Sequence, residues 1–435
     1  MSEAGLVPAS GAEHVLLGIP DVNGSIRGKA LRPSVFKAAL DEGTVMTDLF
    51  LALDPCDVPI TDYDRFGIRS GAADLLVRPD PATLRELAWR PGWQVCLGTP
   101  SWMDGSPCNL AAREVLRRCL DDLRTMGFES LAAFEYEVRI FDGSGRPLSN
   151  GISYSVTEVL AFERLVAALE PALSGLGIEL SAVHTEAGPG LLELNVAPRE
   201  GLQAADEAAL LKMAVKDVAS SLGLRASFLA KTVASEEGSS GHVHLSLWRG
   251  GENAFAQRAA QDPPHEPLAG AIAGIIEHLP AASLLFNPTI NSYKRLVPGY
   301  FAPVNATWGH ENRSAALRVI WSALPGRCRL ECRRPGADAN PYLALAALAA
   351  SVAAGIRERR EPPPPVLGDA SVRADLAPLP SSLEEALRAF HADAALQARL
   401  GEEFSAYFEI SRAWELKAWQ QTVTDWERAR YEAAV

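Results

Sequence analysis

The chain has 435 residues, and at about 150 residues per domain this length predicts two or three folded units. Hydrophobic residues make up 48% and charged residues 22%, which is ordinary globular composition and excludes a disordered, collagenous or low-complexity protein. The 41 basic and 54 acidic side chains give a formal net charge of −13, which argues against a general nucleic-acid binder or a protein that docks on anionic membranes.

The first 106 residues predict a small domain rich in strands. Strand-like segments separated by turn residues lie at 14–19, 26–31 and 93–97. One short helix is expected over 34–40, with Ser34 as its N-cap after Pro33. This pattern indicates a small mixed β domain that ends at residue 106.

From residue 107 to the C-terminus the sequence predicts a larger α+β domain. Short alternating strands separate long helices, which are expected at 111–126, 156–169, 204–222, 268–285 and 340–356. A proline run at 362–365 predicts a stiff surface segment. Helices resume at 381–394 and 409–432, and Ser382 and Glu385 have the spacing of a capping box.

Neither a membrane segment nor a targeting signal is expected. The longest nearly apolar run, residues 342–356, is short of the roughly 20 residues that a spanning helix needs. No Lys or Arg precedes Arg27, whereas secretory and transit peptides begin with basic residues. The six cysteines lack zinc or redox spacing, which suits reduced thiols. We therefore expect a cytoplasmic protein without a membrane or nucleic-acid partner.

Four strand-like stretches carry polar groups on a single face, because side chains two residues apart in a strand point the same way. These groups are Glu135 with Glu137; Glu186 and Glu193 across the Gly188–Pro189–Gly190 turn; His242, His244 and Ser246; and Arg329, Glu331 and Arg333. One such pair alone would favour a solvated strand edge. Four together indicate carboxylates gathered around cations.

The donor types in these stretches favour oxygen-binding metals and phosphate chemistry. Oxygen-rich sites with at most one imidazole suit Mg²⁺ or Mn²⁺ better than structural zinc. Several arginines accompany the acids, and arginine forks bind phosphates and carboxylates: Arg295, Arg313, Arg318, Arg329 and Arg333. Acids and arginines together predict metal-assisted phosphoryl transfer. Neither a P-loop nor a complete Rossmann turn is present, so ATP must be held in another way.

Six motifs occur in an order that resembles the glutamine synthetase family, type I branch, over nearly the whole chain. They lie at 21–29 (DVNGSIRGK), 78–85 (RPDPATLR), 287–300 (NPTINSYKRLVPGY), 312–315 (NRSA), 329–333 (RLECR) and 338–346 (DANPYLALA). The resemblance implies an N-terminal β-grasp domain, residues 1–106, and a catalytic domain, residues 107–435, with a curved antiparallel sheet flanked by helices. It further implies a homo-oligomer, a dodecamer of two hexameric rings with active sites between subunits.

The same resemblance implies a role for each candidate site residue. Two or more Mg²⁺ or Mn²⁺ ions per site would be held by two sets of ligands. Glu137, Glu186 and Glu193 would bind the ion nearer the amino acid, and Glu135, His242 and Glu331 the ion between the ATP phosphates. His244, Ser246, Arg318 and Arg329 would contact ATP, Arg313 and Arg318 would face the transferred group, and Arg295, Arg333 and Gly238 would bind glutamate.

The flap after the Lys-Arg-Leu-Val-Pro-Gly motif departs from the family pattern. Glutamine synthetases carry there a glutamate that binds ammonium and accepts its proton, whereas this chain has Phe301. A phenyl ring cannot accept a proton, but it can line an apolar pocket for a substituent on nitrogen. The sequence therefore predicts an ATP-dependent ligase that forms a γ-glutamyl amide, through γ-glutamyl phosphate, from glutamate and an amine larger than ammonia. Polyamines, ethanolamine, alkylamines and arylamines are the candidate acceptors, as in the γ-glutamyl-amine ligases of this family.

Two alternatives remain open on the sequence. Phe301 could merely pack the flap of an ordinary glutamine synthetase that uses ammonium, and Asp48 is the nearest candidate for a second ammonium-binding acid. Glu237 stands where the family has an asparagine near the amino-acid site, which means either that binding of the donor amino acid is altered or that the alignment with the family motif is offset by one or two residues. A non-catalytic ring protein is disfavoured, because such proteins lose metal ligands and all six are retained here.

Overall fold

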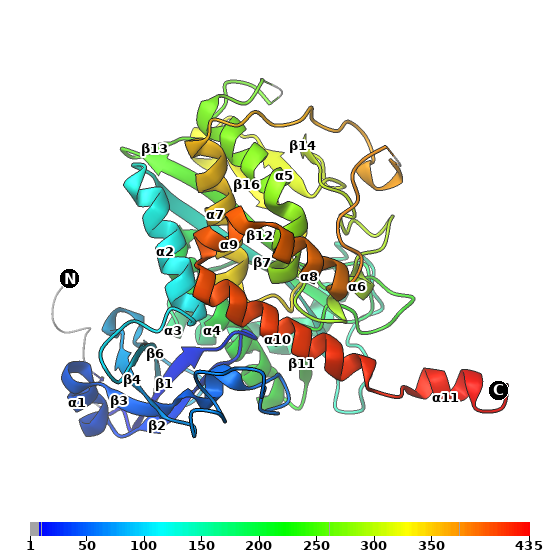
Figure 1. The fold of residues 1–435 in the computed structure, drawn as a ribbon. Coiled ribbons are helices and arrows are strands. Elements are labelled where there is room, and N and C mark those ends of the chain that lie inside the picture. The colour runs from blue at the N-terminus through cyan, green and yellow to red at the C-terminus, as the bar shows by residue number, and fades with distance from the viewer. Residues whose placement is uncertain (1–7, 10, 261, 374) are drawn as a thin grey trace.

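The computed structural model describes residues 8–9, 11–260, 262–373 and 375–435, and its helices pack around two β-sheets (Figure 1). The smaller sheet is built from β1 (His14–Pro20), β2 (Ile26–Leu31), β3 (Thr44–Thr47), β4 (Asp74–Pro79), β5 (Arg85–Glu86) and β6 (Trp93–Trp102). The strand order is β2-β1-β6-β4-β3, with β5 paired to β6; β1 and β6 are parallel and the other pairs antiparallel. The predicted strand-rich N-terminal unit is confirmed, while its boundary at residue 106 stays a proposal.

The hairpin turn and the helix of this first unit follow from local chemistry. Asp21 Oδ1 accepts hydrogen bonds from the backbone N–H groups of Asn23 and Ser25, and Gly24 takes a φ of 82° in the turn. Arg32 occupies the N-cap position of helix α1 (Pro33–Glu42) without a side-chain hydrogen bond, so the expected Ser34 N-cap was wrong. The reason is that a proline fits the first helical position, which moves the N-cap two residues earlier.

The larger sheet carries the candidate site residues. It contains β7 (Glu129–Phe141), β8 (Leu180–Thr185), β9 (Leu191–Val196), β10 (Arg199–Glu200), β11 (Arg225–Ser227), β12 (Gly241–Arg249), β13 (Glu252–Asn253), β14 (Trp308–His310), β15 (Leu317–Ile320) and β16 (Arg329–Cys332). Its main order is β14-β15-β16-β12-β7-β9-β8, with β7 and β12 near the centre. Every pair is antiparallel except β14 with β15, which confirms the predicted α+β class.

Ten α-helices beyond α1 complete the described part of the larger unit. They are α2 (Ala112–Thr125), α3 (Glu163–Gly175), α4 (Gly201–Ser221), α5 (Glu266–Phe286), α6 (Ser292–Arg295), α7 (Pro341–Arg357), α8 (Leu383–Ala392), α9 (Ala394–Leu400), α10 (Glu402–Gln420) and α11 (Asp425–Tyr431). The helix predicted at 156–169 was misplaced, because α3 starts at 163 and continues past Pro171. Its buried Leu165, Leu169 and Leu173 recur every four residues, and this packing offsets the hydrogen bond that the proline removes.

Helices α5 and α7 lie close together in the core. A Cβ on Gly355 would meet the Gly270 carbonyl oxygen at 1.9 Å, so glycine is required where the two backbones approach. By length and composition α5 is the one described helix that could cross a bilayer, but 89% of its apolar window is buried inside the fold. The sequence predicts this helix at 268–285, whereas the longest nearly apolar run, residues 342–356, lies in the shorter α7. This burial is what a core helix of a globular unit shows.

The C-terminal region differs in detail from the prediction. Four helices, α8 to α11, replace the two expected ones, and α11 extends away from the body of the molecule (Figure 1). Ser382 caps α8 by accepting from the Glu385 N–H at 3.1 Å, but the Glu385 carboxylate binds the N–H of Ser381 rather than that of Ser382. The full capping box instead joins Thr424 and Glu427 at the start of α11.

A buried lysine of α4 connects the helix layer to the segment before α7. Lys212 Nζ donates to the carbonyl oxygens of Ala337 and Ala339 at 2.7 and 3.1 Å, and it lies 5.3 Å from the centre of the Tyr136 ring. Burial lowers the pKa of Lys212 to about 7. The ammonium therefore loses its proton in the folded protein near neutral pH, whereas an unfolded chain keeps it up to about pH 10.

This difference predicts a pH-dependent contribution to stability. Between about pH 7 and 10 the unfolded state binds one more proton than the folded state at Lys212, so this group makes stability rise with pH. The free energy of unfolding of the wild type minus that of Lys212→Met should increase by about 1.4 kcal/mol per pH unit across this window. Denaturant titrations at several pH values measure it. Lys37→Met on exposed α1 is the control, and curves for Lys212→Met and wild type that stay parallel would contradict the assignment.

Candidate active site

Two neighbouring cavities open on one face of the larger sheet. The first cavity, of about 400 Å³, is lined by β7, β12 and the segment around β16. The second cavity, of about 490 Å³, is lined by the ends of β7, β9 and β12 and by loops that include the flap at Tyr300 and Phe301. Glu135 lines both cavities, so its carboxylate stands at their junction.

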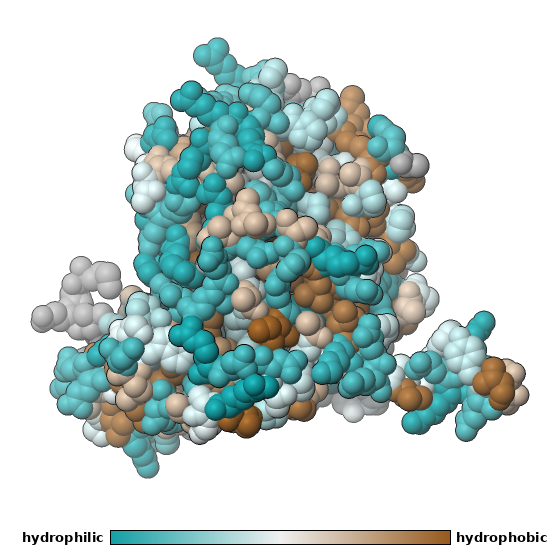
Figure 2. Space-filling model, viewed as in Figure 1, coloured by the Kyte–Doolittle hydropathy of each residue, from teal (hydrophilic) through white to brown (hydrophobic). Residues whose placement is uncertain are grey.

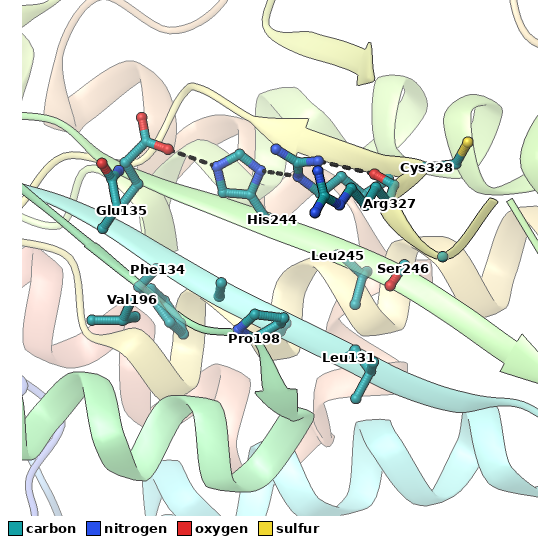
Figure 3. Close-up of a pocket in the computed structure, with 15 residues that line it drawn as sticks. Leu131, Phe134, Glu135, Val196, Pro198, His244, Leu245, Ser246, Arg327 and Cys328 are labelled. Atoms are coloured by element: carbon teal, nitrogen blue, oxygen red, sulfur yellow. Dashed lines mark hydrogen bonds and ion pairs between the residues drawn. The ribbon is translucent and has the colours of Figure 1, made fainter. Parts of the chain in front are cut away.

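The first cavity has apolar walls and one polar end (Figure 3). Leu131, Phe134, Val196 and Pro198 form apolar walls. At the polar end, Arg329 Nε donates to His244 Nδ1 at 3.1 Å, and His244 Nε2 lies 2.9 Å from Glu135 Oε2. Because Nδ1 accepts from the guanidinium, the His244 proton sits on Nε2 and is donated to Glu135. The predicted ATP residues His244, Ser246 and Arg329 all line this cavity.

A first group of possible metal ligands consists of Glu135, His242 and Glu331, which offer ligand atoms within 4.8 Å of one another. The antiparallel register places His242 directly opposite Glu135 on adjacent strands. His242 Nδ1 lies 3.5 Å from Glu331 and 3.6 Å from Glu135, and it is buried without a hydrogen-bond partner among the described residues. Burial and the charge of Arg333 lower the pKa of His242, which leaves a neutral imidazole able to bind a cation.

Arginines keep Glu331 ionised at this group. Its side chain is 1% exposed, and its two oxygens accept from Arg333 Nη1 at 2.5 Å and Arg318 Nη1 at 3.0 Å. Burial opposes ionisation, but Arg333 and the neighbouring histidines lower the pKa of Glu331 to about 2. Arg318 is also bound by Glu311, and it lines neither described cavity. The Arg318 guanidinium is thus held beside this first group of possible metal ligands rather than inside a cavity.

A second group of possible ligands consists of His184, Glu186 and Glu193. His184 Nε2 lies 2.8 Å from Glu193 Oε1, and its Nδ1 lies 3.3 Å from Glu186 Oε1. Burial and the charge of Glu137 raise the pKa of Glu186 to about 7. Burial opposes charge on His184, but its hydrogen bond to Glu193 raises the pKa of the imidazole to about 9. The cluster carries more acid than its surroundings neutralise, which fits a divalent cation.

The predicted partner Glu137 lines the same cavity as Glu186 and Glu193, and its role as a metal ligand stays a proposal. It faces Glu193 in the β7–β9 register and lines the second cavity, but its Oε2 accepts from the Ser240 N–H at 2.7 Å. In the described residues, His184 completes the metal-sized group instead. The sequence contains a signal for His184, because His184 and Glu186 are two residues apart and lie on the same side of an extended chain. Tyr154, also missed, stacks on His184 at 4.3 Å.

Basic side chains also line the second cavity. Arg295, Arg313 and Arg333 line it, as predicted for the residues that bind anionic groups. Arg295 is 3% exposed and donates to the carbonyl oxygens of Arg333 and Arg334. A Cβ on Gly238 would meet the Ala230 carbonyl oxygen at 2.4 Å, so only glycine fits there. Because both acids and arginines line it, the cavity is complementary to a small zwitterion.

The flap and the acidic loop complete the second cavity. Phe301 lines it with a φ of 51° and is 62% exposed, and Glu237 lines it from the loop before β12. Burial and the charge of Glu137 raise the pKa of Glu237. Asp48 is 1% exposed and accepts from the Gly67 N–H and the Ser70 hydroxyl. In this chain Asp48 therefore stabilises a turn beside the smaller sheet.

Removal of one ligand from each group should affect one metal site at a time. Glu186→Gln should weaken Mn²⁺ binding at the His184 group, and Glu331→Gln at the His242 group, each by about 100-fold or more, because a neutral amide replaces an anionic ligand. Isothermal titration of Mn²⁺ without substrates measures both classes of site. Glu207→Gln, a buried acid outside both groups, should leave both unchanged. Loss of both sites in either variant, with folding intact, would contradict two separate groups.

Comparisons with known proteins agree with this geometry. A family model described as the catalytic domain of glutamine synthetase matches residues 109–431. The γ-glutamylethanolamide synthetase of Streptomyces coelicolor is 35% identical over 98% of this chain and 94% of its own. The glutamate–isopropylamine ligase of a Pseudomonas species is 33% identical over 96% and 95%.

The glutamine synthetase of Thermus thermophilus is also 33% identical, over 96% of this chain and 95% of its own. The solved structure of a GmaS–ADP complex superposes with a TM-score of 0.86 at 28% identity and covers 98% of this chain and 97% of that one. The chain therefore belongs to the glutamine synthetase family, whose enzymes are ligases that use ATP, glutamate, an amine and divalent metal ions.

Proposed function

We propose that this ligase joins the γ-carboxylate of L-glutamate to a primary amine larger than ammonia, through γ-glutamyl phosphate. The observation that supports this proposal most directly is Phe301, which lines the second cavity at the flap position where a proton-accepting glutamate is expected. Two relatives with 33–35% identity over nearly the full chain are named as a γ-glutamylethanolamide synthetase and a glutamate–isopropylamine ligase.

ATP is assigned to the first cavity and glutamate to the second. The apolar walls of the first cavity suit a planar base, while His244, Ser246 and Arg329 offer polar contacts at its far side. Arg295 and Arg333 are the proposed ligands of the glutamate carboxylates, and Gly238 leaves room for the amino acid. Glu135 lies between the cavities, where the γ-phosphate and the γ-carboxylate must meet.

Mg²⁺ or Mn²⁺ ions fit both acidic groups. Glu135, His242 and Glu331 would hold one ion, and Glu186 and Glu193 another, with His184 and Glu137 beside them. Bound ions supply positive charge to the phosphates and the transferred phosphoryl group. The arginines act on the same charge: Arg313 lines the second cavity, and Arg318 is oriented by Glu311 and Glu331.

The amine is assigned to the aromatic side of the second cavity. Tyr154, Tyr300 and Phe301 line this part of the wall, with Glu186 and Glu237 close by. Aromatic rings give apolar area to a substituent on nitrogen, but they cannot replace the hydration of a small ammonium ion. A carbon substituent on the nucleophile therefore gains binding energy that ammonia lacks.

An ordinary glutamine synthetase is the second candidate function. Several relatives, including the protein of Thermus thermophilus, carry that name at similar identity. In this case Phe301 would only pack the flap, and another acid of the second cavity would bind ammonium. The two functions differ in the acceptor alone, so an acceptor assay separates them.

The acceptor assay measures phosphate release with ATP, glutamate and about twenty amines, including ammonium, ethanolamine, isopropylamine and a polyamine. We expect kcat/KM for the best organic amine to exceed that for ammonium by about 100-fold or more. Ammonium lacks the contact between a carbon substituent and the aromatic wall, and this apolar contact is worth about 2–3 kcal/mol. Phe301→Glu should narrow this ratio by at least about tenfold, whereas Phe301→Leu should largely keep it. Ammonium as the best acceptor of the wild type would establish the second candidate instead.

We further propose a cytoplasmic homo-oligomer, a dodecamer of two hexameric rings, with residues 1–106 as the unit that completes a neighbouring site. Neither cavity is lined by described residues of the smaller sheet of the same chain. The C-terminal arm, residues 422–435, bears exposed apolar side chains: Val423 is 64%, Trp426 62% and Tyr431 45% exposed. Figure 2 shows hydrophobic atoms on this projecting arm, which supports burial against another subunit.

Deletion of residues 422–435 should therefore lower the oligomeric state. We expect the dominant species in mass photometry to fall from twelve copies to six or fewer, because the arm's apolar contacts are lost while the rest of the fold is kept. Replacing the exposed Trp426 by Glu should act in the same direction. An unchanged mass distribution in both variants would show that the arm is not part of the interface.

A further inference from the structure

Arg139 is a buried charged residue on the active face of β7 that the candidate chemistry leaves without a role. Glu135, Glu137 and Arg139 alternate along this strand and share its face. The Arg139 side chain is 1% exposed, although an isolated buried guanidinium is costly. Its contacts therefore have to account for its presence beneath the second cavity.

One set of contacts reaches the turn between β8 and β9. Arg139 Nη1 donates to the Pro189 carbonyl oxygen at 2.9 Å. A Cβ on Gly188 would lie 2.9 Å from Arg139 Nη2, so the turn backbone rests directly on the guanidinium. Glu186 and Glu193, which belong to the second metal-sized group, stand on the two sides of this turn.

The other set of contacts reaches the acidic loop, residues 236–240. Arg139 Nη1 forms an ion pair with the Glu236 carboxylate, and Nη2 donates to the Glu237 carbonyl oxygen at 2.9 Å. The same loop places Gly238 in the second cavity, and its Ser240 N–H binds Glu137. The two segments thus share one planar cation whose donors point in fixed directions.

We propose that Arg139 is a positioning residue that holds the 187–190 turn and the 236–240 loop at a fixed separation, so that the acids and the glycine floor of the second cavity keep their relative geometry. The proposal rests on the proposed function for its catalytic meaning. Its structural content concerns only the two segments and the guanidinium between them.

Lys231 also connects the acidic loop to the flap. Lys231 Nζ donates to the Glu236 carbonyl oxygen and lies 5.0 Å from the centre of the Tyr300 ring. A displacement of Glu236 would therefore move the Lys231 ammonium, which lies over the Tyr300 ring of the flap. Arg139 thus affects the amine side of the cavity as well as the amino-acid side.

The first test is hydrogen exchange of the wild-type protein and of Arg139→Met, without substrates. We expect exchange to quicken by about tenfold or more in two separate segments, around 186–191 and 231–241, because both lose a shared anchor. Arg225→Met is the matched control, since Arg225 packs on Phe141 at the end of the same strand and its side chain forms no hydrogen bond or ion pair with the described residues of either segment. Unchanged exchange in either segment would overturn the proposal.

The second test separates positioning from simple stabilisation. In Arg139→Met the KM for glutamate and the Mn²⁺ dissociation constant at the His184 group should rise about tenfold or more, while ATP binding in the first cavity stays within about twofold. Arg139→Lys should recover part of the lost glutamate and Mn²⁺ binding, because lysine keeps the positive charge but not the bidentate geometry. Equal weakening of glutamate and ATP binding would mean a general loss of stability and would reject the proposal.

Glu236→Gln keeps the test decisive if Arg139→Met fails to fold. This variant keeps the shape of the ion pair and removes its charge, so the same two segments should exchange faster by a smaller factor, with the thermal midpoint nearly unchanged. Exchange that changes in the loop alone, and not in the turn, would also reject the proposal. Because hydrogen exchange needs no acceptor amine, its result stands even if the proposed amide-forming reaction is wrong.

Discussion

The constraint on which the rest of the structure depends is electrostatic repulsion among buried carboxylates on one face of the larger sheet. Glu135, Glu193 and Glu331 lie within a few strands of one another, and Glu331 and Glu193 are almost fully buried. Without positive partners such groups would protonate or the sheet would separate. Histidines and arginines provide those partners, and the remaining excess of acid provides the affinity for divalent cations.

The antiparallel register determines where each partner stands. His242 lies opposite Glu135, His244 opposite Glu331, and Glu137 opposite Glu193. A slip of one residue between β7 and β12 would turn every one of these side chains to the other face of the sheet. The site is therefore specified by the same pairing that buries Tyr136 and Val138 on the opposite face.

Much of this site could be predicted from the sequence, because period-two spacing along a strand reveals a shared face. The pairs on β7 and β12, the arginines near β16 and the turn between Glu186 and Glu193 all followed from it. Contacts to backbone atoms could not be predicted in this way. Glu137 accepts from the Ser240 N–H, and Arg139 donates to two carbonyl oxygens far along the chain. The spacing of side-chain types in the sequence indicates neither contact, because the partners are backbone atoms. The ends of helices could not be predicted for a similar reason, since the packing of α3 outweighs the helix-breaking effect of Pro171.

Backbone strain is present at the second cavity and beside Arg318. Three of the six described non-glycine residues with a positive φ lie there: Tyr154, Phe301 and Glu311 have φ values of 52°, 51° and 48°, a conformation that costs about 1–2 kcal/mol for a residue with a side chain. Tyr154 is stabilised by stacking on His184, and Glu311 by bonds to Arg318 and the Trp321 N–H. Phe301 is 62% exposed and lacks an aromatic partner within the described residues. The flap is therefore the part of the site whose conformation is held least by the chain itself, and it is also the part that carries the change from acid to aromatic.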